Sequence, residues 1–160
     1  MTIIKAPFPS PVSWHNAPYP AISPNLPSLS AANKTIAVTG AGSGIGFNIA
    51  RAFAQAGAAK LVLLGRTSST LLSAKSSIEI LYPTVKVFVF VADVTNEASV
   101  VSAFGGIKEE VGEVNVLVSN AGYLPDILST KDISVKEWWR GYEVNVLGTF
   151  IGKLSSLKSK

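Results

Sequence analysis

The glycine-rich segment from Thr39 to Gly46 contains the residue types that a phosphate-binding turn requires, and it lies between an apolar run and a helical pattern. Glycine lets a backbone bend tightly and approach oxygen atoms without interference from a Cβ atom. The first amides of a helix and the positive end of its dipole attract phosphate. A plain strand-to-helix turn, the alternative, needs fewer glycines. The segment predicts a site for the linked phosphates of a dinucleotide, with contacts from Gly40, Ser43, Gly44, Ile45 and Gly46.

A second candidate residue, Arg66, follows the apolar run Leu61–Leu64 and lies twenty residues after Gly46. In dinucleotide-binding folds this position contacts the adenosine ribose, and an acidic residue there selects an unphosphorylated 2′-hydroxyl. A guanidinium group instead offers charge-assisted hydrogen bonds to a 2′-phosphate. Arg66 therefore predicts NADP(H) in preference to NAD(H), and NAD(H) stays the alternative. A solvated arginine without a ligand is the other interpretation.

Polar residues and glycine also follow the third and fourth apolar runs, where open α/β sheets bind their ligands. Asp93 comes after Val85–Val91, and Asn120 and Gly122 come after Val114–Val118. A further polar residue, Asn145, interrupts the last helical pattern, although asparagine is a poor helix former. Asn145 is either a polar core residue with satisfied hydrogen bonds or a functional one.

The elements that position these residues alternate between strand and helix from Lys34 onward. The strands are continuous apolar runs, as expected when both faces of a parallel sheet are covered. Helices between parallel strands require right-handed crossovers. The sequence therefore predicts an α/β fold with a Rossmann-like, doubly wound parallel sheet in three α/β/α layers. The expected strands are 36–38, 61–64, 85–91 and 114–118, and the expected helices are 45–56, 69–81, 96–111 and one that begins at Ser134.

Two helices show apolar residues at helical spacing. The first predicted helix places Ile45, Ile49, Phe53 and Ala56 on one face. In the last helix, apolar residues recur every fourth position, and this face could pair with a partner in a homo-oligomer. The residues of that face are Trp138, Tyr142, Val146, Phe150 and Leu154.

The first 33 residues differ from the rest, because seven of the nine prolines of the chain lie before Asn33. Proline supplies no amide donor and fixes φ, which excludes a helix or a central strand. We expect residues 1–33 to form an extended arm along the globular part. Residues 34–160 are expected to form the dinucleotide-binding domain.

The composition excludes several classes of protein. Of 160 residues, 48% are hydrophobic and 15% are charged, so the chain is not of the disordered type. The net charge is +4, but three lysines fall in the last eight residues, which argues against nucleic-acid binding. With no cysteine and one histidine, no metal site is expected. No apolar run reaches the ~18 residues of a membrane span, so we expect a cytoplasmic protein.

Taken together, these motifs resemble those of the short-chain dehydrogenase/reductase family over residues 34–152. The turn resembles the family pattern Thr-Gly-x-x-x-Gly-x-Gly, and Asn120-Ala121-Gly122 resembles its Asn-Asn-Ala-Gly, with Ser119 in place of the first asparagine. The resemblance implies that Asp93 and Val94 contact the adenine ring and that Asn120, Ala121 and Gly122 belong to the cofactor site. It also implies that Asn145 belongs to the catalytic group and holds a proton-relay water.

The resemblance further implies hydride transfer between a nicotinamide cofactor and an alcohol or carbonyl substrate, which needs a serine and a Tyr-x-x-x-Lys pair after Asn145. No tyrosine follows Asn145. Tyr82 and Lys86 have the correct spacing, but Pro83 prevents the helical turn that would place them together. We therefore expect a chain that lacks its catalytic half and binds cofactor without turnover. The family sheet order also predicts an exposed apolar edge at 114–118.

Three interpretations of the chain remain open at this point. The chain is either the cofactor-binding part of such an oxidoreductase, a non-catalytic module for cofactor binding or dimerisation, or a truncated fragment without function.

Overall fold

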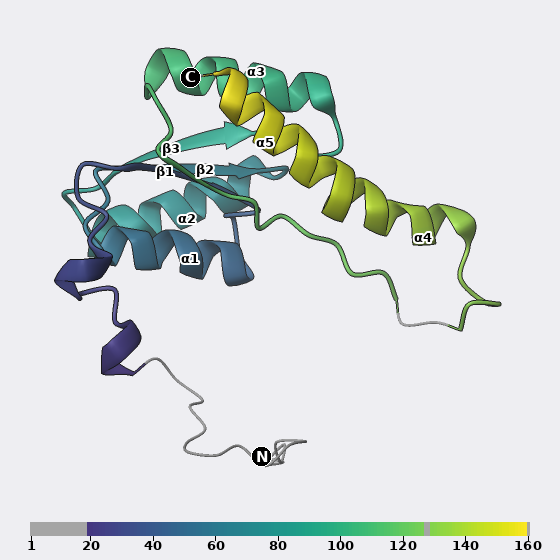
Figure 1. Ribbon diagram of the computed structural model, residues 1–160, viewed down its shortest axis with the longest axis horizontal. Helices are drawn as coiled ribbons and strands as arrows, with labels where there is room; N and C mark the ends of the chain where they lie inside the picture. Colours follow the sequence, from purple (N-terminus) through teal and green to yellow (C-terminus); the bar gives the residue numbers. More distant parts are fainter. Residues whose placement is uncertain (1–18, 127–128, 160) are drawn as a thin grey trace.

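The computed structural model describes residues 19–126 and 129–159 (Figure 1). Within them, a four-stranded parallel sheet has the order β3-β2-β1-β4. The sheet confirms the predicted doubly wound α/β fold, because the chain moves outward from β1 to β3 and then returns to the other side of β1. Its strands are β1 Thr35–Thr39, β2 Lys60–Gly65, β3 Lys86–Val91 and β4 Val116–Val118.

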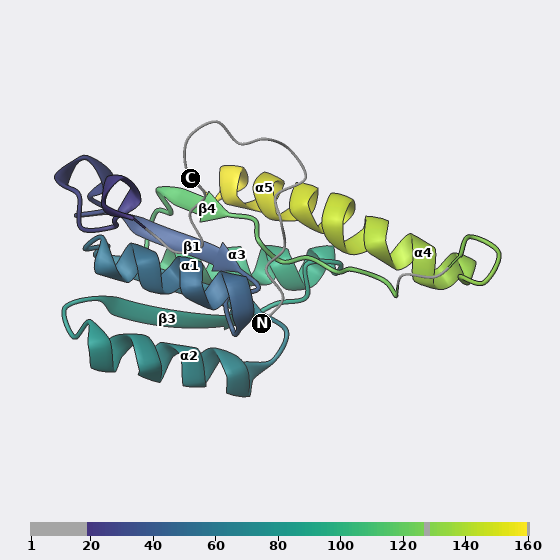
Figure 2. The same cartoon turned by 90° about the horizontal axis from the view of Figure 1, so that it is seen from below.

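Helices cover both faces of the sheet. Helices α1 and α2 lie on one face, and α3 and α5 lie on the other (Figures 1 and 2). The bounds are α1 Gly44–Gln55, α2 Ser68–Leu81, α3 Glu97–Glu110, α4 Val135–Tyr142 and α5 Thr149–Lys158. The predicted elements all exist, with ends within two residues of those expected for most of them.

The central strands explain why the apolar runs are continuous. In β1, Ile36 and Val38 are fully buried against α1 and α2, and Ala37 is fully buried on the α3 side. Strand β2 repeats the pattern with Leu61 and Val62. The side chains of β1 and those of Leu61 to Leu64 in β2 are therefore removed from water, which stabilises the fold by about 1.5–3 kcal/mol for each large residue.

The face predicted for α1 is wrong at Ile45, which is 75% exposed. The fully covered stripe of this helix is instead Gly46, Ala50 and Ala54. Small side chains allow the helix axis to lie close to the sheet. The larger residues Ile49 and Phe53 then pack at the sides of the contact, half-buried.

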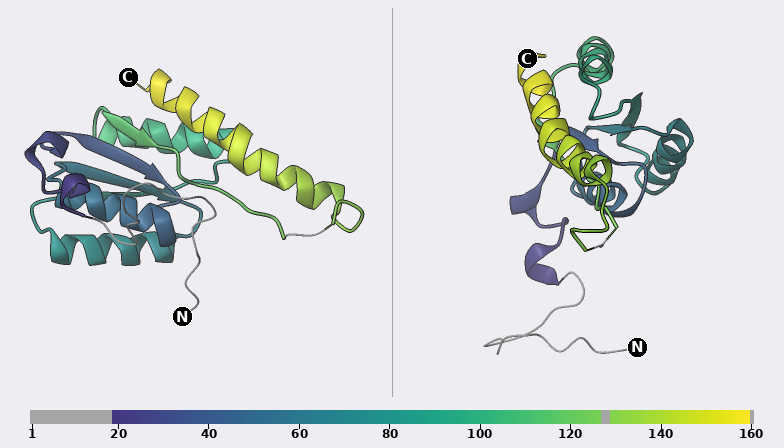
Figure 3. Two further views of the ribbon diagram at one scale, coloured as in Figure 1. Left: turned by 60° about the horizontal axis from the view of Figure 1, so that its bottom comes forward. Right: turned by 90° about the vertical axis from the view of Figure 1, so that its right-hand side faces the viewer.

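The last predicted helix is interrupted at its middle. Ser134 caps α4, since its Oγ accepts a hydrogen bond from the Glu137 amide at 3.1 Å. A π-helical turn, η3 (Glu143–Gly148), joins α4 to α5. Gly148 lies against Val94, where a Cβ atom would come within 2.8 Å of the Val94 side chain. Helix α5 therefore packs beside α3, whereas α4 extends away from the sheet (Figure 3).

Residues 19–33 are the described part of the segment that was expected to form an extended arm. They contain two 3-10 turns, η1 Pro20–Ile22 and η2 Pro27–Leu29, each with proline at its first position, where a missing amide costs nothing. Ala31 is buried and donates its amide to the Ala56 carbonyl at 2.9 Å, which anchors the segment beside the end of α1. The more N-terminal prolines lie outside the described residues.

Strand β4 lies at the edge of the sheet, and among the described residues it pairs with β1 alone. Its three residues are half-buried. The expected edge is therefore apolar but half-buried and not exposed, and Val114 precedes the strand and is buried among the residues of α3.

Candidate functional site

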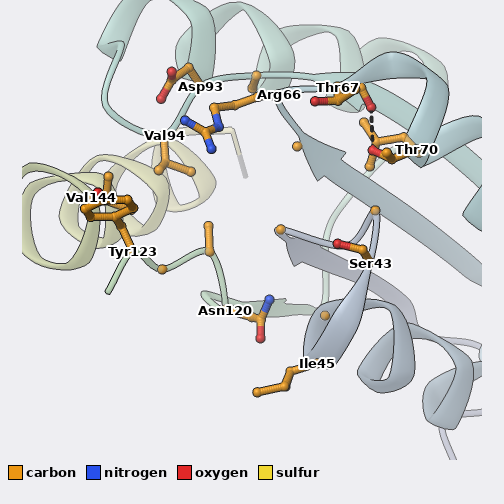
Figure 4. Close-up of a pocket in the computed structure, with 18 of the residues that line it drawn as sticks. Ser43, Ile45, Arg66, Thr67, Thr70, Asp93, Val94, Asn120, Tyr123 and Val144 are labelled. Carbon is orange, nitrogen blue, oxygen red and sulfur yellow. Dashed lines mark hydrogen bonds between the residues drawn. The ribbon is translucent and has the colours of Figure 1, made fainter. Parts of the chain in front are cut away.

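The carboxyl ends of the four strands surround one cavity of about 640 Å³. Eleven of the twelve residues predicted for the site line this cavity (Figure 4). They come from the β1–α1 turn, from the segments after β2, β3 and β4, and from η3. These residues are Gly40, Ser43, Ile45, Gly46, Arg66, Asp93, Val94, Asn120, Ala121, Gly122 and Asn145. Gly44 does not line the cavity but lies in the same turn.

The β1–α1 turn depends on glycine at specific positions. Gly40 and Gly44 have φ values of +66° and +57°, a region that L side chains rarely adopt. A Cβ atom at Gly46 would overlap the carbonyl oxygen of Gly40 and the carboxamide of Asn120. The turn therefore allows α1 to begin directly against the strand ends.

The first turn of α1 faces the cavity. The Ser43 side chain is exposed and makes no capping hydrogen bond, and Phe47 is the first helical residue whose amide reaches the Ser43 carbonyl. The amides of Gly44, Ile45 and Gly46 precede it and have no partner within the helix. A helix of twelve residues adds its dipole to these donors. This end of the cavity suits an anion.

Thr39 joins the first and fourth strand ends. Its Oγ1 accepts the backbone amides of Asn120 and Ala121, both at 3.0 Å. The Asn120 Nδ2 donates to the Thr39 carbonyl at 2.9 Å. The Asn120 carboxamide is thus used to hold the turn, and Thr39 is a structural part of the site beyond the predicted contacts.

A second group of residues lies where β2 and α2 meet. The exposed Arg66 side chain points into the cavity beside Val94 (Figure 4). Thr67 precedes α2 without a side-chain capping bond, and Thr70 Oγ1 donates to the Thr67 carbonyl at 2.9 Å. The next helix N-terminus and a guanidinium group therefore open on the same cavity. Thr67 and Thr70 were not predicted, although both follow Arg66 closely in the sequence.

Asp93 carries a negative charge beside this group. Partial burial alone would raise the pKa of its carboxyl, but the hydrogen bonds from Thr95 outweigh that effect and lower it. The Thr95 amide and hydroxyl both donate to Asp93 Oδ1, at 2.9 and 2.8 Å. The positive charges of Arg66 and Arg140 lower the pKa further. The carboxylate is therefore ionised at neutral pH.

Asn145 closes the opposite wall. Its Oδ1 accepts the Tyr123 amide and its Nδ2 donates to the Tyr123 carbonyl, both at 2.8 Å. The residue is exposed, so it is not a core residue. It lies in the π-helical turn η3, and such turns occur frequently at functional sites. Its own carbonyl accepts the Thr149 hydroxyl at 2.9 Å.

The cavity also has walls that sequence reasoning missed. Tyr123 and Leu124 directly follow Gly122, and Val144 directly precedes Asn145, so adjacency to a predicted residue was the available signal for all three. The remaining lining residues outside the prediction are Gly42, Gly65, Thr67, Thr70, Leu71 and Ala92.

The Tyr82 and Lys86 pair lies away from the cavity, and the described residues hold neither a metal site nor a membrane-spanning helix. Tyr82 is the C-cap residue that follows α2 and Lys86 begins β3, so no helical turn joins them, and neither lines the cavity. Within residues 19–126 and 129–159, no group of three or more His, Asp or Glu side chains could hold a metal ion. In the same residues, no helix is both long and apolar enough to cross a bilayer.

Comparison with known proteins identifies relatives of this arrangement. The family model described as short chain dehydrogenase matches residues 34–159. The short chain dehydrogenase tazN of Aspergillus terreus is 36% identical over 137 residues, which cover 86% of this chain and 29% of that protein. The 17-beta-hydroxysteroid dehydrogenase 13 of Rattus norvegicus is 37% identical over 123 residues, covering 76% of this chain and 39% of that protein.

Solved structures show the same fold. The L-sorbose reductase of Gluconobacter frateurii, in complex with NADPH and L-sorbose, superposes with a TM-score of 0.74 at 25% identity, covering 81% of this chain and 48% of that one. An alcohol dehydrogenase from Thermococcus sibiricus, in complex with 5-hydroxy-NADP, gives 0.73 at 34% identity, covering 79% and 52%. The chain spans less than half the length of the curated relatives it matches.

Proposed function

The chain belongs to the short-chain dehydrogenase family, and we propose that its cavity binds a nicotinamide dinucleotide, with NADP(H) preferred over NAD(H). The observation that carries the proposal is the contact at Gly46, where only a residue without Cβ lets the start of α1 meet the Gly40 carbonyl. This close approach directs the first amides of α1 toward the cavity. We assign the linked phosphates of the cofactor to the amides of Gly44, Ile45 and Gly46.

The adenosine end of the cofactor belongs beside Asp93 and Val94. Thr95 holds Oδ1 of the ionised Asp93 carboxylate. We assign Oδ2 to the exocyclic amino group of adenine, which is a hydrogen-bond donor. Val94 supplies apolar contact with the ring, and the backbone of Gly65 leaves space for the ribose.

The proposed preference for the phosphorylated cofactor rests on Arg66 and Thr67. A 2′-phosphate beside Arg66 gains a charge-assisted hydrogen bond and lies near the N-terminus of α2, a helix of fourteen residues. Two structural relatives were solved in complex with NADPH or with an NADP analogue, which supports the same choice.

The nicotinamide end belongs beside Gly122, Tyr123 and Asn145. The cofactor would supply or accept a hydride, and the full-length parent would pass it to or from an alcohol or carbonyl substrate. Of the residues that the family uses for proton transfer, this chain contains Asn145. Because no tyrosine follows Asn145 in the sequence, we expect the chain to bind cofactor without reducing a carbonyl compound.

Calorimetry tests the binding step. NADPH and NADH are titrated into the complete 160-residue chain, and we expect saturable heat with both and a lower Kd for NADPH. A cooperative melting transition confirms that the protein used for the titration is folded. Folded protein that gives no heat with either cofactor at millimolar concentration contradicts the proposal. Steady consumption of NADPH with a panel of ketones contradicts the expected lack of turnover.

A second role, pairing of two copies of the chain, is favoured by the exposed apolar face of α4, η3 and α5. Trp138, Tyr142, Val146 and Phe150 are each between 47% and 61% exposed. Light scattering should therefore report a dimer. The Phe150→Asp variant should be monomeric, and Lys153→Asp, on the same helix, should remain dimeric. A monomeric wild-type protein removes this role and leaves cofactor binding unaffected.

A further inference from the structure

Tyr123 makes two contacts with α4 in addition to its place in the cavity wall. Its hydroxyl donates a hydrogen bond to the Glu137 carboxylate. The Arg140 guanidinium lies over the ring, with Cζ 4.3 Å from the ring centroid. Glu137 and Arg140 are three residues apart on one face of the helix, so a single aromatic side chain contacts both. We call Tyr123, Glu137 and Arg140 the Tyr123 latch.

Apart from its continuation through η3 into α5, helix α4 has no burial in the core to hold it in place. No residue of α4 is buried, and the helix extends beyond the sheet (Figure 3). Its aromatic residues Trp138, Trp139 and Tyr142 pack against one another and are about half exposed. A helix without core burial is positioned by its polar and cation–π contacts. The latch supplies such contacts on the side of α4 that faces the cavity wall.

The backbone of Tyr123 performs a different task. Its amide and carbonyl hold both ends of the Asn145 carboxamide at 2.8 Å. Tyr123 therefore joins the segment after β4 to α4 through its side chain and to η3 through its backbone. Displacement of residue 123 would move Leu124 and Asn145 together, and both line the cavity.

We propose that Tyr123 is a positioning residue whose phenol, held by Glu137 and Arg140, keeps its own backbone in the place where it orients Asn145 and the wall of the cavity. The consequence for cofactor rests on the proposed function, because that wall lies at the end assigned to the nicotinamide. The role of the phenol differs from that of an apolar lining residue, for which phenylalanine would serve equally well.

Hydrogen exchange at the Tyr123 amide reports directly on the position of the Tyr123 backbone, because that amide proton is donated to Asn145 Oδ1. In the complete chain, Tyr123→Phe keeps the ring and its contact with Arg140 but removes the bond to Glu137. We expect the amide of residue 123 to exchange about tenfold faster, the equivalent of one lost hydrogen bond. The amides of β2 should be unchanged, which separates the latch from a general loss of stability.

Matched variants sharpen the test. Glu137→Gln retains an acceptor for the phenol and should exchange within about twofold of wild type, whereas Glu137→Ala should behave like Tyr123→Phe. Tyr82→Phe changes a tyrosine outside the cavity and should have no effect at residue 123. Equal exchange in wild type, Tyr123→Phe and Glu137→Ala overturns the proposal. Should Tyr123→Phe fail to fold, the Gln and Ala variants at position 137 decide it alone.

The consequence for the ligand is measured with two probes. NADPH occupies the whole proposed site, whereas adenosine 2′,5′-bisphosphate lacks the nicotinamide end. Tyr123→Phe should raise the Kd for NADPH about three- to tenfold and leave that for the bisphosphate within twofold. Equal weakening of both probes refutes the assignment to the nicotinamide end. If neither probe binds wild-type protein, the proposed function fails, and the exchange experiment still decides the role of Tyr123.

Discussion

Reversal of the charge at Arg66 should change the choice between the two nicotinamide cofactors. Arg66 is exposed and lines the cavity beside Val94, and its positive charge helps to lower the pKa of the Asp93 carboxyl. In Arg66→Asp, a carboxylate replaces the group assigned to the 2′-phosphate. It would repel the phosphate of NADPH and accept a hydrogen bond from the 2′-hydroxyl of NADH.

The expected magnitude follows from one charge-assisted hydrogen bond, which is worth about 1.5–3 kcal/mol. Since about 1.4 kcal/mol corresponds to a factor of ten, the ratio of the Kd for NADH to that for NADPH should fall about ten- to a hundredfold. Solvent screening at an exposed arginine places the expectation toward the lower end of this range. Most of the change should appear as weaker NADPH binding.

Fluorescence titration with both reduced cofactors at constant ionic strength measures this ratio. The matched control is Lys153→Asp, which makes the same change in net charge on the exposed surface of α5, outside the cavity lining. Its cofactor preference should equal that of wild type. A ratio within twofold of wild type in Arg66→Asp refutes the assignment. The same shift in both variants would show that net charge, and not the position of Arg66, is responsible.

Three further changes test other parts of the site. Gly46→Ala places a Cβ atom on the Gly40 carbonyl, so calorimetry should show NADPH binding at least tenfold weaker than in wild type. The control is Gly105→Ala, which should bind NADPH normally because a Cβ atom there meets nothing within 4 Å. The pKa of Asp93 lies below 3.8 in the folded chain, so its contribution to stability is present above pH 3.8 and disappears as the pH falls through the lowered value. The melting temperature of Asp93→Asn should accordingly fall less than that of wild type on acidification, and an equal fall in both proteins would contradict this. The hydrogen bond to Glu137 raises the pKa of Tyr123 above 10.0. The difference in phenolate absorbance between wild type and Tyr123→Phe reports on Tyr123 alone, and it should develop above pH 10. A midpoint below pH 10 would argue against the latch.

The sheet could be predicted because both of its faces are covered. Runs such as Ile36–Val38 and Leu61–Leu64 contain no polar residue and prove to be fully or almost fully buried. The strand ends carry the site in such folds, so the positions of Arg66 and Asp93 followed from the order of the elements. Local sequence was sufficient for these features.

Other features depended on contacts that local patterns do not contain. The buried stripe of α1 consists of Gly46, Ala50 and Ala54, whose small side chains add little to an apolar pattern although they permit the closest packing. The pattern of large apolar residues therefore favours Ile45, which is exposed. The bonds between Tyr123 and Asn145 join residues 22 positions apart, and neither residue type identifies the other as its partner.

The contacts of Asn120 show how the resemblance to a family and the physical role of a residue can differ. The residue was predicted as part of the cofactor site, yet its carboxamide donates to the Thr39 carbonyl and occupies space that a Cβ at residue 46 would need. It therefore holds together the end of β1, the first turn of α1 and the start of the segment after β4. Because hydrogen bonds join the end of β1 to the segment after β4, and the first turn of α1 packs closely against both, the turn that we assign to the phosphates is formed before any ligand arrives. Its affinity for a dinucleotide should then depend more on the glycines that allow this contact than on the side chain of Asn120 touching the cofactor.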